Sequence, residues 1–226
     1  MGKKAVAIFE SIYPLIIYYA IISLVTEGLL HFTVLKDISY SLPQIIAKII
    51  CIPAMLYFYN MSKHKSRLGK SAIEKVKAAF VAIVAGVTSC IVFNLLIEFI
   101  NLKAYSPMYR KVINAMGSDV LIIQIIGAII IAPIIEEIVF RGIFYYKLRQ
   151  AIPTVLAILI SAVVFGIAHF NIVQGVYAAL LGVVFALIYE KTGELWTAVL
   201  AHMAANTFAF FGPALYDLPE KILKLF

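Results

Sequence analysis

Charged residues are scarce in this sequence. Asp, Glu, Lys and Arg make up 14% of the 226 residues, whereas a typical soluble domain contains about 25%. Apolar residues make up 63%, and long apolar runs recur between Val6 and Phe211. The alternation of apolar and polar residues that a membrane β-barrel requires is missing. The sequence therefore predicts an all-α fold, a polytopic membrane helical bundle.

Other missing features exclude several classes of function. The two cysteines, Cys51 and Cys90, fall in apolar segments and have neither disulfide nor metal-binding spacing. Glycine loops that bind phosphate, dinucleotide fingerprints and calcium loops are all missing. The basic start is followed by an apolar stretch that is long for a signal peptide, so we expect no cleavable signal. The net charge of +7 is typical of cytoplasmic loops that determine membrane topology, so we expect no nucleic-acid partner.

Seven apolar segments are expected to enter the membrane. They lie at about 6–30, 43–59, 78–100, 119–150, 153–170, 173–189 and 195–211. Basic residues are concentrated between the second and third segments, at 60–77, and this bias places the N-terminus in the cytoplasm. Linkers, repeats and low-complexity tracts do not divide the chain. We therefore expect a single membrane domain, 1–226.

The first three segments contain few polar residues that could take part in chemistry. Glu27 lies near the outer end of the first segment, and Lys48 lies inside the second. We expect these two side chains to form a structural ion pair.

The fourth segment contains three charged residues in an otherwise apolar run. A charge at the centre of a membrane helix costs about 2.5–3.5 kcal/mol, so these residues need partners or a hydrated cavity. Arg141 lies four residues after Glu137, on the same helix face, and the two can pair. Glu136 points about 100° away from that pair. The simplest interpretation is an ion pair that organises helix packing, with a spare carboxylate.

Two later segments add polar groups to this set. His169 follows Phe165 by four residues in the fifth segment, and Asn206 follows His202 by four residues in the seventh. Each pair therefore lies on one helix face. Ionisable groups inside a membrane are rare and usually face an interior cavity. We predict that Glu136, the two histidines and the asparagine converge on a shared aqueous cavity.

These four residues allow two mechanisms. In the first, Glu136 is a general base for a water held jointly with His169, and His202 and Asn206 donate hydrogen bonds to an oxyanion. In the second, Glu136, His169 and His202 bind Zn2+, which matches the ligand count of catalytic zinc. The spacing differs from the H-E-x-x-H helix of metalloproteases. Asn206 favours the version without a metal, because an amide is a good oxyanion donor and a poor zinc ligand.

The three motifs, in this order and on separate apolar helices, resemble the CAAX prenyl protease and bacteriocin-processing (CPBP, or Abi) family of intramembrane proteases. The motifs read Glu136-Glu137-x-x-x-Arg141, Phe165-x-x-x-His169 and His202-x-x-x-Asn206. The resemblance covers residues 119–211, which makes residues 1–118 accessory transmembrane helices.

The resemblance implies a hydrolase, an intramembrane endopeptidase that acts on a membrane-associated peptide or protein. It implies that the catalytic residues are Glu136, His169, His202 and Asn206. It also implies that three residues support them: Glu137, Arg141 and Phe165. The family includes proteins called metalloproteases and a eukaryotic branch that looks like a glutamate-type protease, so the resemblance leaves the cofactor, none or Zn2+, open. The short chain is similar to the bacterial branch, which is linked to peptide processing and bacteriocin immunity. This similarity implies a bacterial cell membrane, and a prenylated substrate does not follow from it.

Two other classes of function remain compatible with the sequence. A non-catalytic bacteriocin self-immunity or peptide-binding membrane protein could keep the same fold. A small transporter could use Glu136 and the two histidines as a proton relay, although the inverted-repeat hydropathy of many transporters is not evident.

Overall fold

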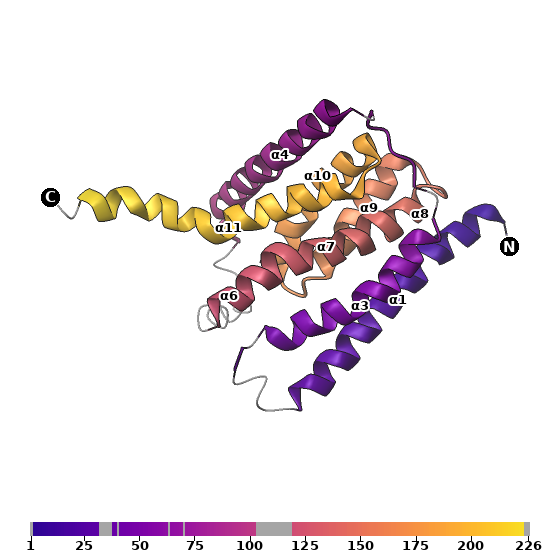
Figure 1. The fold of residues 1–226 in the computed structure, drawn as a ribbon, viewed down its shortest axis with the longest axis horizontal. Coiled ribbons are helices and arrows are strands. Elements are labelled where there is room, and N and C mark those ends of the chain that lie inside the picture. Colours follow the sequence, from indigo (N-terminus) through magenta and orange to yellow (C-terminus); the bar gives the residue numbers. More distant parts are fainter. Residues whose placement is uncertain are drawn as a thin grey trace.

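The computed structural model describes residues 2–31, 38–39, 41–62, 64–69, 71–102 and 119–223, with side chains up to residue 212. All regular structure within these residues is helical (Figure 1). The helices are α1 (Lys3–Leu30), α3 (Leu42–Asn60), α4 (Ala72–Phe99), α9 (Thr154–Ile167), α10 (Ile172–Thr192), α11 (Leu195–Leu223) and a continuous helix from Leu121 to Leu148. That continuous helix contains α6 (Leu121–Gln124), η2 (Ile125–Ile131), α7 (Ala132–Glu137), η3 (Ile138–Tyr145) and α8 (Tyr146–Leu148), where η marks π-helical turns.

Six of these helices are long and apolar enough to cross a membrane, and α9 is a shorter apolar helix. The predicted all-α, polytopic bundle of seven apolar segments is therefore confirmed, and the chain is an integral multi-pass membrane protein. Large apolar side chains such as Leu24, Phe80 and Phe99 are exposed, as expected for helix faces that meet lipid. The last helix continues through two prolines to Leu223, beyond the predicted end at residue 211.

The helices form two groups around the Leu121–Leu148 helix (Figure 1). On one side, α1 and α3 pack against each other and against η3. On the other side, α10 lies against α9, α4 and α11, and α4 also packs along α11. The Leu121–Leu148 helix therefore has the N-terminal helices on one face and the later helices on the other.

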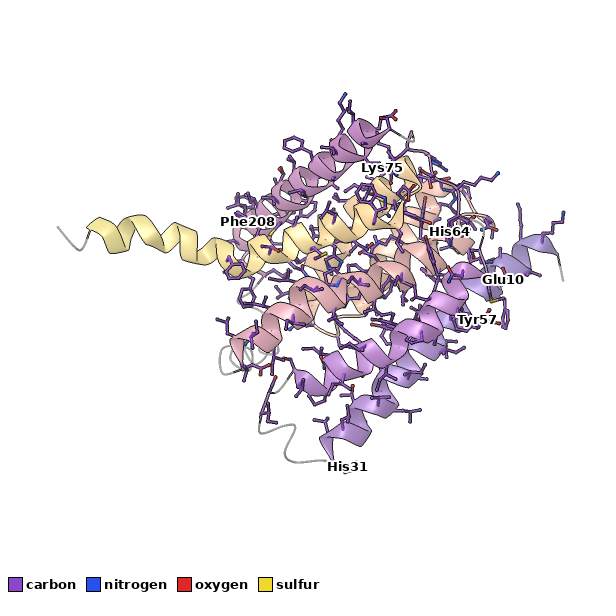
Figure 2. All side chains as sticks on the ribbon, in the orientation of Figure 1. Glu10, His31, Tyr57, His64, Lys75 and Phe208 are labelled. Atoms are coloured by element: carbon purple, nitrogen blue, oxygen red, sulfur yellow. The ribbon has the colours of Figure 1, made fainter. Side chains whose placement is uncertain are left out.

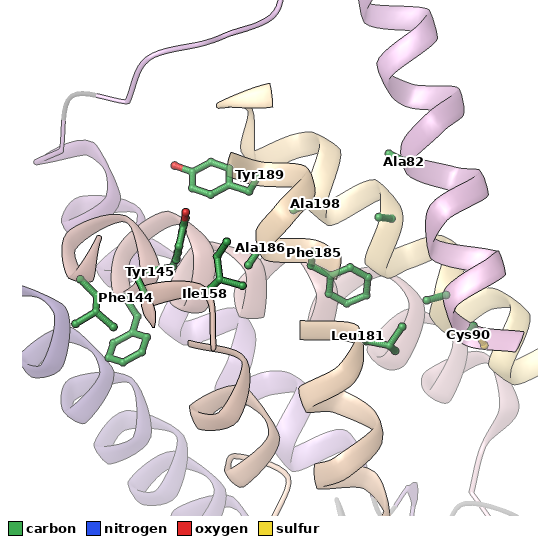
Figure 3. Packing of buried hydrophobic residues seen from close by; sticks show 14 residues of the cluster. Ala82, Cys90, Phe144, Tyr145, Ile158, Leu181, Phe185, Ala186, Tyr189 and Ala198 are labelled. Atoms are coloured by element: carbon green, nitrogen blue, oxygen red, sulfur yellow. The ribbon is translucent and has the colours of Figure 1, made fainter. Parts of the chain in front are cut away.

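Small residues allow the later helices to approach closely. Figure 3 shows Ala82, Ala186 and Ala198 among the larger buried side chains of Phe185 and Tyr189. A Cβ atom on Gly86 of α4 would lie 2.1 Å from the carbonyl oxygen of Ala201 on α11. Glycine is therefore required at this crossing, in keeping with the small residues typical of membrane helix interfaces.

One end of the bundle gathers the N-terminal part of α1, the 64–69 loop, α8 and the end of α10. Lys147 Nζ lies 2.8 Å from Glu10 Oε2, and Arg67 Nη1 lies 2.7 Å from Glu190 Oε1. The His64 ring stacks on Tyr59 with 4.0 Å between ring centroids, and Figure 2 shows His64 at the same end as Glu10. The segments predicted to be cytoplasmic therefore lie together, and their orientation in the membrane stays a prediction.

Candidate active site

The helix that carries the carboxylates is not a regular α-helix. Pro133 lacks a backbone N–H and its ring clashes with the carbonyl of residue i−4, which disfavours an uninterrupted α-helix. The chain accommodates this proline with the π-helical segment η2 before it, and a second π-helical segment, η3, follows Glu137. Single π-helical turns inside α-helices are often found at functional sites.

Glu137 forms the most buried part of the site. Its side chain and that of Arg141 are both 0% exposed, and Arg141 Nη1 donates to Glu137 Oε1 at 3.0 Å. The same oxygen lies 2.9 Å from His202 Nδ1. Arg141 Nη2 also donates to the carbonyl oxygen of Gly182 on α10, at 3.1 Å. The predicted pairing of Glu137 with Arg141 is confirmed, and this pair connects the continuous helix with α10 and α11.

Two phenylalanines enclose this polar network. The guanidinium carbon of Arg141 lies 4.3 Å from the ring centroid of Phe165 and 5.5 Å from that of Phe185. The His202 ring stacks on Phe185, with 4.7 Å between centroids. Cation–π contacts of this kind are stronger where water is excluded. Phe165 and Phe185 therefore hold the guanidinium and the imidazole in place.

Glu136 faces away from that network and contacts a different helix. Lys48 Nζ on α3 donates to Glu136 Oε1 at 2.7 Å, and the two side chains are 22% and 13% exposed. The predicted pairing of Lys48 with Glu27 is wrong. Glu136, like Lys48, lies inside the bundle at the level where α3 packs on α7, whereas Glu27 is exposed near the end of α1.

His169 lies just beyond the end of α9, which ends at Ile167. The apolar segment was predicted to continue as a helix to residue 170. Its Nδ1 atom lies 2.9 Å from the carbonyl oxygen of Phe165. The next residue, Phe170, has a φ of 51°, a left-handed conformation that is unusual for a bulky side chain. This turn ends α9 and holds His169 before Asn171, whose side chain caps α10.

The short length of α9 indicates that His169, just beyond its end, lies within the thickness of the bilayer. The helix has 14 residues, about 21 Å at about 1.5 Å per residue, and the hydrocarbon core is about 30 Å thick. A helix of this length that begins at one surface ends inside the bilayer. Phe165 lies beside both histidines, with its ring centroid 5.1 Å from that of His169 and 5.8 Å from that of His202.

The structure brings three of the four predicted catalytic residues together. Glu136 lies within electrostatic range of both His169 and His202, and both Glu136 and His169 keep partial exposure while Glu137 is fully buried. Asn206 lies one turn beyond His202, and its Nδ2 donates to the carbonyl oxygen of Ala128 at 2.7 Å. One of the two amide protons of Asn206 is therefore used by the backbone of η2.

The residues of the predicted zinc site do not form a compact ligand set. In the described part of the chain, no three His, Cys, Asp or Glu side chains lie close enough together to hold a metal ion. Glu136 Oε1 is paired with the cationic Lys48, and His202 Nδ1 is bound to Glu137. This donor arrangement does not fit the three-ligand site of catalytic zinc, and zinc binding stays a prediction.

Three residues that contact the site, Lys48, Gly182 and Phe185, were not predicted to belong to it. Lys48 could have been found, because a charged residue inside a membrane helix is a functional candidate in its own right. Gly182 and Phe185 carry no such signal, because small and aromatic residues are common throughout α10. Their proximity to Arg141 depends on how α10 packs against the continuous helix.

Comparison with known proteins gives an independent measure of the resemblance. Residues 118–208 match the family described as Type II CAAX prenyl endopeptidase Rce1-like. A Bacillus subtilis (strain 168) protein described as "Putative membrane peptidase YdiL" is 31% identical over 148 residues, which are 64% of this chain and 57% of that protein. The chain thus spans little more than half the length of this relative. No solved structure matches the chain.

The matched segment contains every motif residue from Glu136 to Asn206. The family match and the relative come from separate comparisons, and both point to membrane peptidases. Together they confirm the resemblance that the three motifs predicted: residues 118–208 carry the sequence pattern of the CAAX prenyl protease and bacteriocin-processing family.

Proposed function

We propose that this protein is an intramembrane endopeptidase that hydrolyses a peptide bond in a membrane-associated peptide or protein. The observation that carries the proposal is that side chains from three helices gather in one place: the Phe165 ring centroid lies 5.1 Å from that of His169 and 5.8 Å from that of His202, and Glu136 interacts electrostatically with both histidines. The similarity to a family of CAAX prenyl endopeptidases supports the same reaction class. The proposed reaction needs a base, a water-orienting group and an oxyanion stabiliser.

Glu136 and His169 supply the first two roles. Because the Phe165 carbonyl can only accept, the His169 Nδ1 at 2.9 Å from it carries the proton. In neutral His169, the Nε2 atom is then an acceptor that can orient a water molecule. Glu136 Oε1 is bound to Lys48, which leaves Oε2 to take a proton from that water. The hydroxide attacks the peptide carbonyl carbon, and the proton passes to the leaving amine as the C–N bond breaks.

His202 and Asn206 supply the third role. His202 Nδ1 donates to the Glu137 carboxylate, so its Nε2 faces away from Glu137 and donates to an oxyanion in the doubly protonated form. Asn206 has one amide proton left after its bond to Ala128. Donors held in place before the reaction stabilise developing charge without reorganising. Arg141 and Phe185 maintain this geometry from outside the reacting atoms.

Cleavage by the purified full chain tests the proposal. The protein is reconstituted in liposomes with a library of fluorogenic membrane-associated peptides, and products are identified by mass spectrometry. Glu136→Gln should lower kcat by about 10²–10⁴-fold, the range for loss of a general base. The matched control is Glu27→Gln, the same change at an exposed carboxylate on α1, which should leave kcat unchanged.

Two results would contradict this proposal in different ways. If wild type binds peptides without cleaving any, the non-catalytic peptide-binding class is favoured. If cleavage is retained in Glu136→Gln, another residue is the base. A parallel series with a chelator and with added Zn2+ separates the two mechanisms, because the metal-free reaction should be insensitive to both.

We further propose that the protein resides in a bacterial cell membrane with its N-terminus in the cytoplasm. Support comes from the basic residues that gather with the N-terminal part of α1 at one end of the bundle. Ser66 is exposed in the 64–69 loop at this end, so the substitution Ser66→Cys places a thiol there. An impermeant maleimide should label it in inverted vesicles and not in intact cells. The reverse pattern would assign the opposite orientation.

A further inference from the structure

We infer that Lys48 is a positioning residue for Glu136, and this inference rests on the proposed function. Lys48 Nζ donates to Glu136 Oε1 at 2.7 Å, from the N-terminal half of α3. A lysine at the centre of a membrane helix costs about 2.5–3.5 kcal/mol, so its presence needs a reason. The motifs of the matched family segment, 118–208, do not include α3.

The packing of α3 does not require this lysine. Ala47, Cys51 and Met55 of α3 are each 0% exposed, so apolar side chains already dock the helix against its neighbours. Cys51 and Met55 belong to the same buried cluster as Tyr18 on α1 and Ile135 on α7. Lys48 therefore adds little to docking, and its specific contact is the proposed base.

The position of α3 is determined by contacts with the helix that carries Glu136. At its start, Ser41 donates through its backbone N–H to Asp119 Oδ2 at 3.0 Å and also through its hydroxyl. One turn later, a Cβ atom on Gly127 of η2 would lie 2.3 Å from Ile45 Cδ1. These contacts connect α3 to the continuous helix at Gly127 and to Asp119, two residues before that helix begins. Lys48 is thus held on a rigid support, which fits a fixed positioning contact and not a removable latch.

The geometry of the contact explains how it would act. The ammonium group binds a single carboxylate oxygen, so Glu136 is restrained in one orientation while Oε2 stays free to accept a proton. The positive charge of Lys48 also offsets part of the cost of placing the Glu136 carboxylate in apolar surroundings. A misplacement of about 1 Å in a catalytic group can cost about 10²-fold in rate. Loss of Lys48 should therefore affect kcat more than KM.

The test compares Lys48 with a second lysine in a similar ion pair. Lys147 lies 2.8 Å from Glu10 and has a 15% exposed side chain, so Lys147→Met is the matched control for Lys48→Met. In the liposome assay, Lys48→Met should lower kcat by about 10- to 100-fold and change KM less than about twofold, while Lys147→Met should leave both unchanged. Lys48→Arg should retain more kcat than Lys48→Met.

A chemical rescue separates charge from packing. Lys48→Cys should be as slow as Lys48→Met, and alkylation of the folded protein with bromoethylamine should restore kcat by rebuilding an ammonium group. The native Cys51 and Cys90 are fully buried, so the new thiol should react first. Wild type treated in the same way controls for their modification.

The outcomes distinguish this inference from the proposed function. An active wild type with unchanged or raised kcat in folded Lys48→Met would overturn the positioning role and leave the endopeptidase intact. Unfolding of both Lys48→Met and Lys48→Arg, measured by thermal melts in detergent, would assign a structural role and also overturn it. A wild type that cleaves no peptide would overturn the proposed function itself.

Discussion

Glu136 and Glu137 are adjacent in the sequence and lie in different surroundings. Glu137 is fully buried and shares one oxygen between Arg141 and His202. Glu136 is 13% exposed and contacts Lys48. The first carboxylate is surrounded by α10 and α11, and the second faces α3. One residue type thus has two different sets of partners on one helix.

The difference is what the proposed function requires, with Glu137 in a supporting role and Glu136 in the chemistry. Successive residues of a helix point about 100° apart, so two adjacent carboxylates enter different layers of the bundle. Glu137 and Arg141 are enclosed by Phe165 and Phe185, and their side chains are 0% exposed. Glu136 lies on the side of α3, and its side chain is 13% exposed. We therefore expect substitutions in the first layer to change stability most and those in the second to change activity most.

Loss of the buried guanidinium should have the largest effect on stability. Arg141→Met should lower the free energy of unfolding by about 3–5 kcal/mol, because Glu137 would remain buried as an unpaired charge. Denaturant titration in detergent measures this change. The control, Arg149→Met, removes a 26% exposed partner of Glu190 and should cost at most about 1 kcal/mol. Equal losses in the two variants would remove the distinction between the two layers.

A smaller loss of stability is expected at the helix that carries His169. In Gly166→Ala, the new Cβ atom would lie 2.4 Å from the carbonyl oxygen of Gly175, and α9 must shift away from α10. Overpacking of this kind costs about 1–3 kcal/mol, and the shift should also lower kcat. In Gly28→Ala, the new Cβ atom meets nothing within 4 Å, and stability should change by less than about 1 kcal/mol. Thermal melts measure the loss of stability, and the cleavage assay measures kcat. A Gly166→Ala variant as stable and as active as Gly28→Ala would contradict this prediction.

The hydrogen bonds from Ser41, at the start of α3, to Asp119 should contribute about 1 kcal/mol to the free energy of unfolding, the usual value for a capping side chain. Asp119→Ala removes the acceptor for Ser41, and Asp119→Asn keeps one acceptor oxygen and should lose less. Both losses are read from denaturant titrations. Equal stability of Asp119→Ala and wild type would indicate that α3 is held by apolar packing alone.

The contribution of Asp119 should also depend on pH. Burial alone would raise the pKa of Asp119, but hydrogen bonds from Ser39, Ser41 and the Val120 N–H hold it below its usual value. The stabilisation is therefore present above the unfolded-state pKa, about 3.9, and is lost as pH falls through the folded-state pKa. Asp119→Ala should show a weaker loss of stability than wild type in this acidic range.

The smallest expected effect concerns His64, which lies outside both layers. Burial lowers the pKa of His64, the hydrogen bond to the Tyr59 carbonyl opposes this change, and Lys147 adds to it. The folded state therefore favours neutral His64, and stability should fall as pH drops below about 6.5, where the unfolded state binds the proton first. Melting temperatures at pH 7.5 and 5.5 should show less pH dependence in His64→Gln than in wild type. The control is His31→Gln, at the exposed end of α1, and an identical pH dependence in all three proteins would contradict the prediction.

The motifs could be predicted from the sequence because they depend on local spacing. Arg141 reaches Glu137 across one helical turn, and the same rule places His202 and Asn206 on one face. The end of α9 was predicted less well, because its left-handed position is occupied by Phe170 and not by a glycine or an asparagine. His169 consequently lies in a turn, where the apolar pattern indicated a helix.

The sequence by itself determined the fold class, the apolar segments and the faces on which Glu137, Arg141, His202 and Asn206 lie. These properties follow from composition and from the period of the helix, which act within one segment. Only the tertiary structure decided that Lys48 contacts Glu136 and not Glu27, and that Phe185 stacks on His202. The physical reason is that helices distant in sequence can pack in many registers, and only their packed arrangement determines which charge meets which partner.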